Sequence, residues 1–345
     1  MLTLIKPERL KKGDTVATVS LSWGGAGDKD LLWRYEKGKR RLTEQFGLRV
    51  VEMPNTLKGS DFVYRHPEKR AEDLMQAFAD PSIRAVIACI GGDDSIRLLP
   101  YIDFDVLRRN PKIFLGYSDS TVTHFMCMKA GIASVYGPSI LAEFAENVKI
   151  FDYTAHWLQK TLFEPEPLGT IPCAGEWTGE RMPWTLENEH TAKVLQKNTG
   201  YEFLQGDAVV QGPLIGGCIE VMEMMKGTAL WPDPHQFDNA VLFLETSEEM
   251  PEPDYIAYWL RNYGVQGVLQ KVSGIVWGKP YQGKHYDAYK QAILKVLAEL
   301  SLTGLPVVYN MSFGHNEPMA CIPYGAKAKI DCRVQTFSIL ESGVR

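Results

Sequence analysis

The first 140 residues alternate between short apolar runs and longer amphipathic segments, and this alternation limits the folds open to the chain more than any other feature. Short apolar runs predict buried strands, and apolar residues repeated at helical spacing predict helices that cover them. Such alternation is typical of a parallel sheet with helices on both faces. We therefore predict an α/β fold. Strands are expected at 15–20, 49–53, 84–90 and 113–115, and helices at 30–46, 67–78, 95–101 and 120–130.

The alternation returns in the second half of the chain after an irregular stretch. Residues 163–206 contain several Pro and Gly residues and little periodicity, and a loop of this length is more often functional or mobile than structural filler. We predict an N-terminal domain at 1–165, a linker and substrate loop at 166–205, and a smaller α/β domain at 206–345. Its strands are expected at 208–211, 240–246, 272–277 and 305–309, and its helices at 218–225, 254–263 and 286–300.

Composition argues against several classes of partner. The net charge of −5 and the pI of about 5.9 give no general attraction to nucleic acid or to an anionic membrane. The chain has no run of 18 apolar residues, so we predict no transmembrane helix, and its N-terminus is too charged for a secretory signal. The six cysteines are scattered without a Cys-x-x-Cys pair, which fits reduced, buried thiols in a cytoplasmic protein.

Ser118 stands at a predicted corner between a strand and a helix. It follows the apolar run 113–115 and Gly116, and Ser120 and Thr121 can begin the next helix. A serine at such a corner has an accessible hydroxyl, and the N–H groups of the helix start point toward an oxyanion on the substrate. Hydrolases present a nucleophile in this way, although the same motif also fits a simple helix cap.

A serine nucleophile needs a base, and the base needs an orienting acid. His315 lies beside a glycine in the loop after the predicted strand 305–309, and Glu245 ends the apolar strand at 240–246. The alternatives are a loop histidine that makes one hydrogen bond and a carboxylate held in a structural ion pair. Glu248 and Glu249 follow closely, so this corner is acidic and suits an imidazolium better than a phosphate.

The loops at 20–27, 91–95 and 117–120 all follow predicted strands, so we expect them to meet at the carboxyl edge of the sheet. Gly91 and Gly92 could bring backbone N–H groups close to a ligand there, or could form a plain turn. The first loop lacks the Gly-x-Gly-x-x-Gly spacing of a dinucleotide site. No His-Glu-x-x-His or Pro-Cys-x-x-Cys motif occurs, so we predict neither a metal nor a cofactor.

The chain as a whole resembles the serine peptidase family that contains the LD-carboxypeptidases and the microcin C immunity peptidases. The motifs that carry the resemblance span both halves: Leu10-Lys-Lys-Gly-Asp14, Ile90-Gly-Gly92, Gly116-Tyr-Ser118-Asp119, Tyr136-Gly-Pro138, Leu214-Ile-Gly-Gly217, Leu242-Phe-Leu-Glu245 and Gly314-His315.

This resemblance implies a role for each candidate residue. Ser118 would be the nucleophile, His315 the general base and Glu245 its partner. The Asp119 N–H and the Gly91-Gly92 turn would form the oxyanion hole. The resemblance also implies a flavodoxin-like N-terminal domain, a triad completed by the second domain, and a homodimer.

The length of the middle segment resembles the microcin immunity branch, in which a loop tryptophan stacks on the base of a peptidyl-adenylate. Trp184 is the best match and Trp177 the second, and packing of the loop is the alternative role for either. The chain departs from the family where Cys218 follows Gly-Gly, and where no lysine follows Glu245 to hold a phosphate.

We therefore expect a serine peptidase that cleaves an amide near the C-terminal end of a small peptide conjugate such as a peptidyl-adenylate. A murein tetrapeptide LD-carboxypeptidase and a non-catalytic ligand-binding protein are the alternatives.

Overall fold

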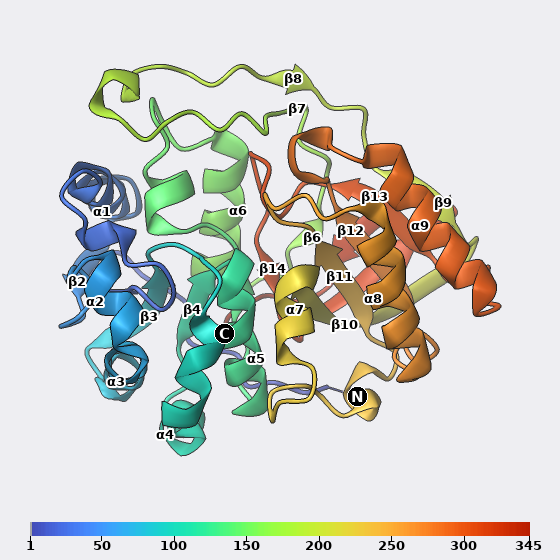
Figure 1. The fold of residues 1–345 in the computed structure, drawn as a ribbon, viewed down its shortest axis with the longest axis horizontal. Coiled ribbons are helices and arrows are strands. Elements are labelled where there is room, and N and C mark those ends of the chain that lie inside the picture. Colours follow the sequence, from blue (N-terminus) through green and yellow to red (C-terminus); the bar gives the residue numbers. More distant parts are fainter. Residues whose placement is uncertain (1) are drawn as a thin grey trace.

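A computed structural model describes residues 2–345, in which two sheets lie side by side (Figure 1). The first sheet has six strands in the order β14-β5-β4-β3-β1-β2. Strands β1 to β5 are parallel, and their order, 2-1-3-4-5, is that of flavodoxin-like sheets, so the predicted fold class is confirmed. The bounds are β1 Thr15–Val19, β2 Arg49–Glu52, β3 Ile83–Ala88, β4 Ile113–Gly116, β5 Val135–Tyr136 and β14 Ile322–Pro323.

Helices cover both faces of this sheet because successive strand side chains point to opposite sides. Ile113 and Leu115 pack with α1 and α6, whereas Phe114 between them packs with α3, α4 and α5. The helices on the first face are α1 Leu32–Phe46 and α6 Asp152–Phe163. Those on the second are α3 Pro67–Ala79, α4 Phe104–Arg109 and α5 Thr121–Lys129, and the short α2 Ser60–Arg65 precedes α3.

The second sheet has eight strands in the order β6-β16-β15-β10-β11-β12-β13-β9. The four central strands, β10 to β13, are parallel, and antiparallel strands extend the sheet on each side. The strands are β6 Gly169–Thr170, β9 Glu202–Gln205, β10 Val209–Cys218, β11 Val241–Glu245, β12 Gly274–Gly278, β13 Val307–Met311, β15 Lys327–Asp331 and β16 Thr336–Ile339. The helices between them are α7 Ile219–Met225, α8 Pro253–Val265 and α9 Tyr286–Glu299.

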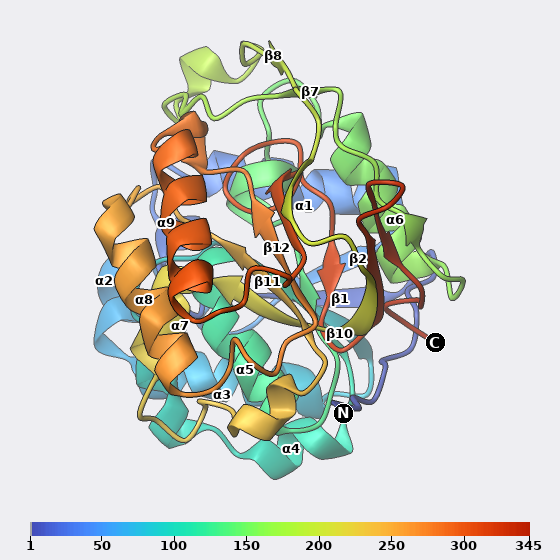
Figure 2. The same cartoon turned by 90° about the vertical axis from the view of Figure 1, so that its right-hand side faces the viewer.

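Residues 171–201 form a strap that runs along the top of the molecule in Figure 1, from the green helices toward the orange ones, and Figure 2 shows it from the side. Among the described residues, β7 Glu176–Trp177 pairs with β8 Gln196–Lys197 within the strap, and Thr178 forms an antiparallel bridge with Glu317, outside the strap. The strands that flank the strap, β6 and β9, are the two edges of the eight-stranded sheet. The predicted domain boundaries at 165 and 205 stay predictions. The predicted linker, residues 166–205, contains a strand of the second sheet near each of its ends, β6 and β9.

The expected strands and long helices appear within a few residues of their predicted bounds, with three differences. The segment 95–101 is a 3-10 helix, and α2, α4 and α6 were not predicted. Strand β10 extends to Cys218, beyond its predicted end, because its glycines interrupted the apolar pattern in the sequence. A Cβ on Gly212 would stand 1.7 Å from the Asn239 carbonyl oxygen, so the glycine lets β10 come close to the segment that leads into β11. Within residues 2–345, no helix is long and apolar enough to cross a membrane.

Candidate active site

Ser118 lies on a sharp turn directly after β4. It begins a 3-10 helix, Ser118–Ser120, that leads into α5, and its φ of +60° lies in the left-handed region that non-glycine residues rarely adopt. The backbone N–H of Ser118 donates a hydrogen bond to the Tyr136 hydroxyl at 3.0 Å. A strained residue of this kind persists where its surroundings hold it in place, and such residues gather at functional sites.

His315 brings Ser118 and Glu245 into one hydrogen-bonded chain. Its Nε2 lies 2.9 Å from Ser118 Oγ, and its Nδ1 lies 2.7 Å from Glu245 Oε2. Because an ionised carboxylate can only accept, Nδ1 carries a proton, and in the neutral imidazole Nε2 is the nitrogen that accepts from the serine hydroxyl. The three side chains come from the end of β4, the end of β11 and the loop after β13. The structure therefore brings together the three residues that the sequence analysis selected.

Glu245 is fully buried, and its surroundings leave no space around it. Its second oxygen accepts a hydrogen bond from the Tyr136 hydroxyl at 2.6 Å. A Cβ on Gly314 would stand 2.7 Å from Glu245 Oε2, and one on Gly278 would stand 2.9 Å from Glu245 Cβ. Sequence reasoning did not assign Tyr136 a role; the tyrosine ends strand β5 of the first sheet, beside β4, and the Tyr136-Gly-Pro138 motif was the available signal.

Glu248 is a second carboxylate beside the histidine. Its Oε2 lies 3.0 Å from His315 Nε2, the nitrogen that also faces Ser118. Burial lowers the pKa of His315, but the charges of Glu245 and Glu248 together outweigh it and hold that pKa well above its ordinary value. The contact with His315 lowers the pKa of Glu248 to about 2.

The residues expected to bind an oxyanion surround the serine. A Cβ on Gly91 would stand 2.9 Å from Ser118 Cβ and 3.4 Å from the Asp119 nitrogen, so the turn after β3 touches the turn after β4. Gly92 has a φ of +144° and lies against Ser22, in the loop after β1. The carboxylate of Asp119 is not part of the cavity lining; it is buried and accepts from the Ser95 N–H at 2.9 Å. The predicted meeting of the three loops is confirmed.

A cavity of about 840 Å³ opens over Ser118 and His315, and the strap forms one of its walls. Trp184, from the strap, lines this cavity and stacks on Trp23 with ring centroids 6.4 Å apart. The guanidinium of Arg34 lies 4.5 Å from the Trp184 ring centroid. Trp177 is not among the lining residues and packs instead against Lys279, whose ammonium lies 4.3 Å from its ring centroid.

Lys193 fastens the strap to the body of the molecule. Its ammonium pairs with Glu146 at 2.7 Å and also with Glu317, two residues after the candidate base. All three side chains are largely buried. Burial raises the pKa of Glu317 to about 8, even though the charge of Lys193 opposes this. No sequence pattern predicted this cluster, because its three residues are far apart in the chain.

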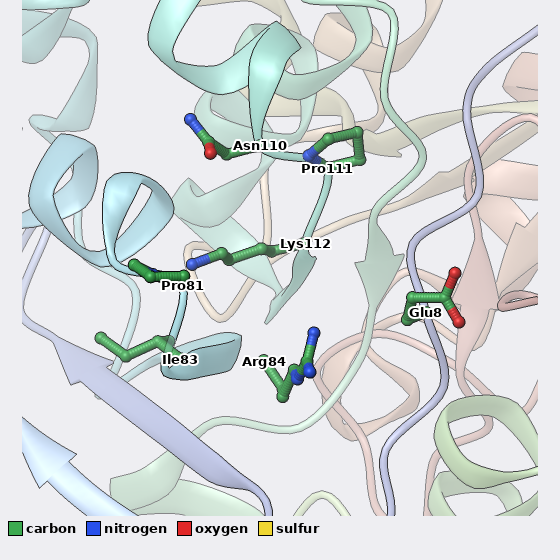
Figure 3. Close-up of a pocket in the computed structure, with 7 residues that line it drawn as sticks. All are labelled: Glu8, Pro81, Ile83, Arg84, Asn110, Pro111 and Lys112. Carbon is green, nitrogen blue, oxygen red and sulfur yellow. The ribbon is translucent and has the colours of Figure 1, made fainter.

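A smaller cavity, of about 200 Å³, lies at the opposite edge of the first sheet (Figure 3). It is lined by Ile83 at the start of β3 and by Lys112 just before β4, whereas Ser118 follows the other end of β4. The Lys112 ammonium already donates to the carbonyls of Ala77 and Asp80. This cavity therefore has no part in the chemistry at Ser118.

The remaining candidates from the sequence lie in structural positions. His124 is buried in α5, where it bonds to Ser134 and to the Gly116 carbonyl, and burial lowers its pKa to about 3. Cys218 is buried, as are Cys89, Cys127 and Cys321. Among residues 2–345, no three His, Cys, Asp or Glu side chains are grouped as metal ligands.

Two family profiles match this chain, one in each half. The profile of the LD-carboxypeptidase N-terminal domain matches residues 16–137, and that of the LD-carboxypeptidase C-terminal domain matches residues 211–330.

Curated proteins of related function are similar to this chain over most of its length. The microcin C7 self-immunity protein MccF of Escherichia coli is 30% identical over 317 residues, 89% of this chain and 88% of MccF. The murein tetrapeptide carboxypeptidase of Pseudomonas aeruginosa is 23% identical over 270 residues, 76% of this chain and 78% of that protein.

Solved structures agree with the fold along the whole chain. An MccF-like protein from Streptococcus pneumoniae in complex with AMP superposes with a TM-score of 0.88, at 34% identity, over 95% of this chain and 98% of that one. MccF in complex with aspartyl sulfamoyl adenosine superposes with a TM-score of 0.86, at 26% identity, over 99% of this chain and 100% of that one.

Proposed function

Because this chain belongs to the LD-carboxypeptidase family, we propose that it is a serine peptidase in which Ser118 is the nucleophile, His315 the general base and Glu245 the acid that orients the base. The observation that carries the proposal is the continuous hydrogen-bonded chain from Ser118 through His315 to the buried carboxylate. A serine, a histidine and a carboxylate in this order form the constellation that makes a hydroxyl nucleophilic at neutral pH.

The reaction proceeds in two halves. Ser118 Oγ attacks the carbonyl carbon of the scissile amide while His315 Nε2 takes the hydroxyl proton. The imidazolium, held by Glu245, then gives this proton to the leaving nitrogen, and the C–N bond breaks to leave an acyl-enzyme. Water attacks the ester in the same manner, and Ser118 regains its proton as the acid product leaves.

We assign the stabilisation of the oxyanion of each tetrahedral intermediate to backbone N–H groups of Asp119 and of the Gly91-Gly92 turn. Asp119 follows the nucleophile at the start of a helix, the usual position of one donor in strand-turn-helix hydrolases. The Gly91-Gly92 turn lies in contact with Ser118 on the neighbouring strand end. Such donors typically contribute about 100-fold or more to the rate.

The residues that line the cavity suit a substrate in which an aminoacyl or peptidyl group is joined to a nucleotide, as in peptidyl-adenylate antibiotics. Trp23 and Trp184 supply aromatic faces and Arg34 a cation beside them, and a nucleobase stacks on such surfaces without needing specific hydrogen bonds. The MccF-like relatives were solved with AMP and with aminoacyl sulfamoyl nucleosides.

Trimming of a murein tetrapeptide is the second candidate. Arg181 lines the same cavity, and a guanidinium there can bind the terminal carboxylate that an LD-carboxypeptidase must recognise. Hydrolysis assays on a murein tetrapeptide and on an aminoacyl sulfamoyl adenosine separate the two, because Trp184→Ala is expected to impair only the second reaction.

Substitution of the nucleophile tests the chemistry itself. We expect Ser118→Ala to fold normally and to lose hydrolysis almost completely, and we expect a serine-directed phosphonate to label Ser118 in the unmodified protein only. Turnover retained by Ser118→Ala would refute the assignment. Absence of labelling in the unmodified protein would favour a ligand-binding protein without catalysis.

Two further parts of the proposal concern the surroundings of the enzyme. We propose that the enzyme acts in the cytoplasm, as its scattered free cysteines indicate, and that it assembles as a homodimer, as the family resemblance implies. Sedimentation velocity on the purified chain measures the second point directly, and a single boundary at the monomer mass would contradict it.

A further inference from the structure

Glu248 is placed where a carboxylate disturbs the triad rather than supports it. Its Oε2 faces His315 Nε2 at 3.0 Å, on the side of the ring that must accept the proton of Ser118. An anion at this position holds the imidazole in its charged form, which cannot act as a base. The supporting carboxylate, Glu245, already occupies the other nitrogen. Glu248 therefore needs an explanation other than orientation of the histidine.

The Glu248 carboxylate has no cationic partner apart from the histidine. Its only ion-pair partner within residues 2–345 is His315, and 39% of its side chain is exposed on the cavity wall. A base must be neutral to accept the proton of Ser118, so during the reaction His315 no longer compensates this charge, and a cation on the ligand can. A cation is the donor that would compensate this charge most strongly.

The cavity lining as a whole carries more negative than positive side chains. Its lining contains six carboxylates and three cations, and two of the cations are already engaged: Lys193 with two glutamates, and Arg34 with the Trp184 ring. Arg181, from the strap, is the third cation and lies beyond ion-pair distance of Glu248. The carboxylates are those of Asp93, Glu143, Glu180, Glu248, Glu249 and Glu317.

Geometry assigns the two ends of the substrate to different walls. Trp23 and Trp184, which suit a nucleobase, lie on the side of the Gly91 turn, where the Trp23 N–H donates to the Gly91 carbonyl. Glu248 lies on the other side of the nucleophile with His315. A phosphate would be repelled by Glu248, so the acyl residue of the substrate faces Glu248. The α-ammonium of that residue lies two bonds from the carbonyl carbon that Ser118 Oγ attacks, so it stays close to the Ser118–His315 pair that Glu248 adjoins.

We propose that Glu248 binds an ammonium group carried by the acyl residue of the substrate, either its free α-amine or a basic side chain. This inference rests on the proposed function, because it names the acyl group that the same site accepts. When the ammonium pairs with Glu248, His315 Nε2 faces Ser118 alone. The enzyme thus selects an acyl residue that carries an ammonium group.

Four matched ligands separate the two sources of the cation. Lysyl sulfamoyl adenosine carries both ammonium groups, norleucyl only the α-ammonium, Nα-acetyl-lysyl only the side-chain ammonium, and Nα-acetyl-norleucyl neither. Their binding to Ser118→Ala is measured by calorimetry, so that turnover does not interfere, and their hydrolysis is measured with the unmodified enzyme. We expect the fully neutral acyl group to bind about tenfold more weakly than at least one of the cationic ones.

Glu248→Gln, placed in the Ser118→Ala background, should abolish this preference while leaving the binding of adenosine, which carries no phosphate, unchanged. Glu252→Gln is the matched control, since Glu252 is on the same loop, is largely exposed and does not line the cavity. Equal binding of all four ligands, or a preference that survives Glu248→Gln, would overturn the inference. Hydrolysis without a cation preference would refute this inference alone, whereas a cation preference without any hydrolysis would refute only the proposed function.

Discussion

At the scale of single residues, one phenolic oxygen joins the proposed nucleophile, Ser118, to the proposed orienting acid, Glu245. The Tyr136 hydroxyl accepts the backbone N–H of Ser118 and donates to Glu245. It therefore holds the strained turn at one end and compensates a fully buried carboxylate at the other. Tyr136 acts through these two residues and is a positioning residue rather than a catalytic one.

Removal of this hydroxyl by Tyr136→Phe leaves the Ser118 N–H and one oxygen of Glu245 without their partner. We expect kcat/KM to fall by roughly 10- to 100-fold, and the free energy of unfolding to fall by about 1–3 kcal/mol. Tyr309→Phe is the control, because it removes a hydroxyl that donates to the Tyr286 carbonyl, away from the triad. Steady-state kinetics and urea unfolding give both values. Equal losses of activity in the two variants would argue against the positioning role.

The pH dependence of the reaction follows from the charges around His315. The groups that face its ring are Glu245, Glu248 and Ser118, with the ring of Tyr117 at 5.1 Å. A general base must be neutral, so kcat/KM should rise as the pH increases through the raised pKa of His315. Glu248→Gln removes a charge that favours the imidazolium, so this rise should move to lower pH. A profile measured with an uncharged substrate tests this, and a rise that moved to higher pH would contradict it.

The sequence predicted the residues that stand at the ends of strands. It did not predict roles that depend on a contact with a distant side chain. Ser118, Glu245 and His315 each follow an apolar strand, and the ends of parallel strands gather at one edge, so their meeting was predictable. Glu248 was predicted only to make the corner after Glu245 acidic, and Lys193 was not predicted at all, since each contacts a side chain that the folded chain alone brings near.

At the scale of elements, two turns pack against each other at the nucleophile. Gly91→Ala would place a methyl group 2.9 Å from Ser118 Cβ and 3.1 Å from Ser118 Oγ, so one of the two turns must move. We expect kcat/KM to fall by about 100-fold, because the hydroxyl and the oxyanion donors lose their alignment. Gly304→Ala is the control, since its Cβ would meet no atom within 4 Å. Activity within twofold of the unmodified enzyme would show that the turn is not restrictive.

The strap depends on one buried cation. Lys193→Met would leave Glu146 and Glu317 buried without their partner, and breaking a buried ion pair in this way costs about 3–5 kcal/mol. We expect the strap to detach locally before the sheets unfold, so that trypsin cleaves after Arg181 faster than in the unmodified protein. Lys197→Met, on the exposed β8, should not change the cleavage rate. Equal rates in both variants would show that the cluster does not hold the strap.

Elements were predictable where a pattern is long enough to repeat. Helix α9 and the apolar strands β4 and β11 appeared close to their expected bounds because burial and periodicity act together there. Strands β14 and β6 have two residues each, which is too short for an alternation of apolar and polar residues to be recognised. Their pairing is decided by the sheet edges that they meet, which are formed by distant parts of the chain.

At the scale of the whole molecule, the two sheets depend on each other. Strand β14, from the second half, completes the first sheet beside β5, and Tyr324 stacks on His124 of α5 with ring centroids 4.7 Å apart. A fragment that ends at residue 165 lacks both contacts. We therefore expect this fragment to lack a cooperative thermal transition and to resist labelling by a phosphonate at Ser118. Calorimetry and mass spectrometry test the two points. A sharp transition in the fragment would show that the first half folds independently.

The spacing of the triad along the chain also sets the order in which its parts are synthesised. Ser118 and His315 are 197 residues apart, which at 5–20 residues per second corresponds to about 10–40 s of translation. During that interval a nascent chain carries the nucleophile without its base, its acid or the last strand of its sheet. Hydrolytic activity is therefore expected only after His315 and strand β14 have been synthesised, so a product of translation interrupted before them is inert.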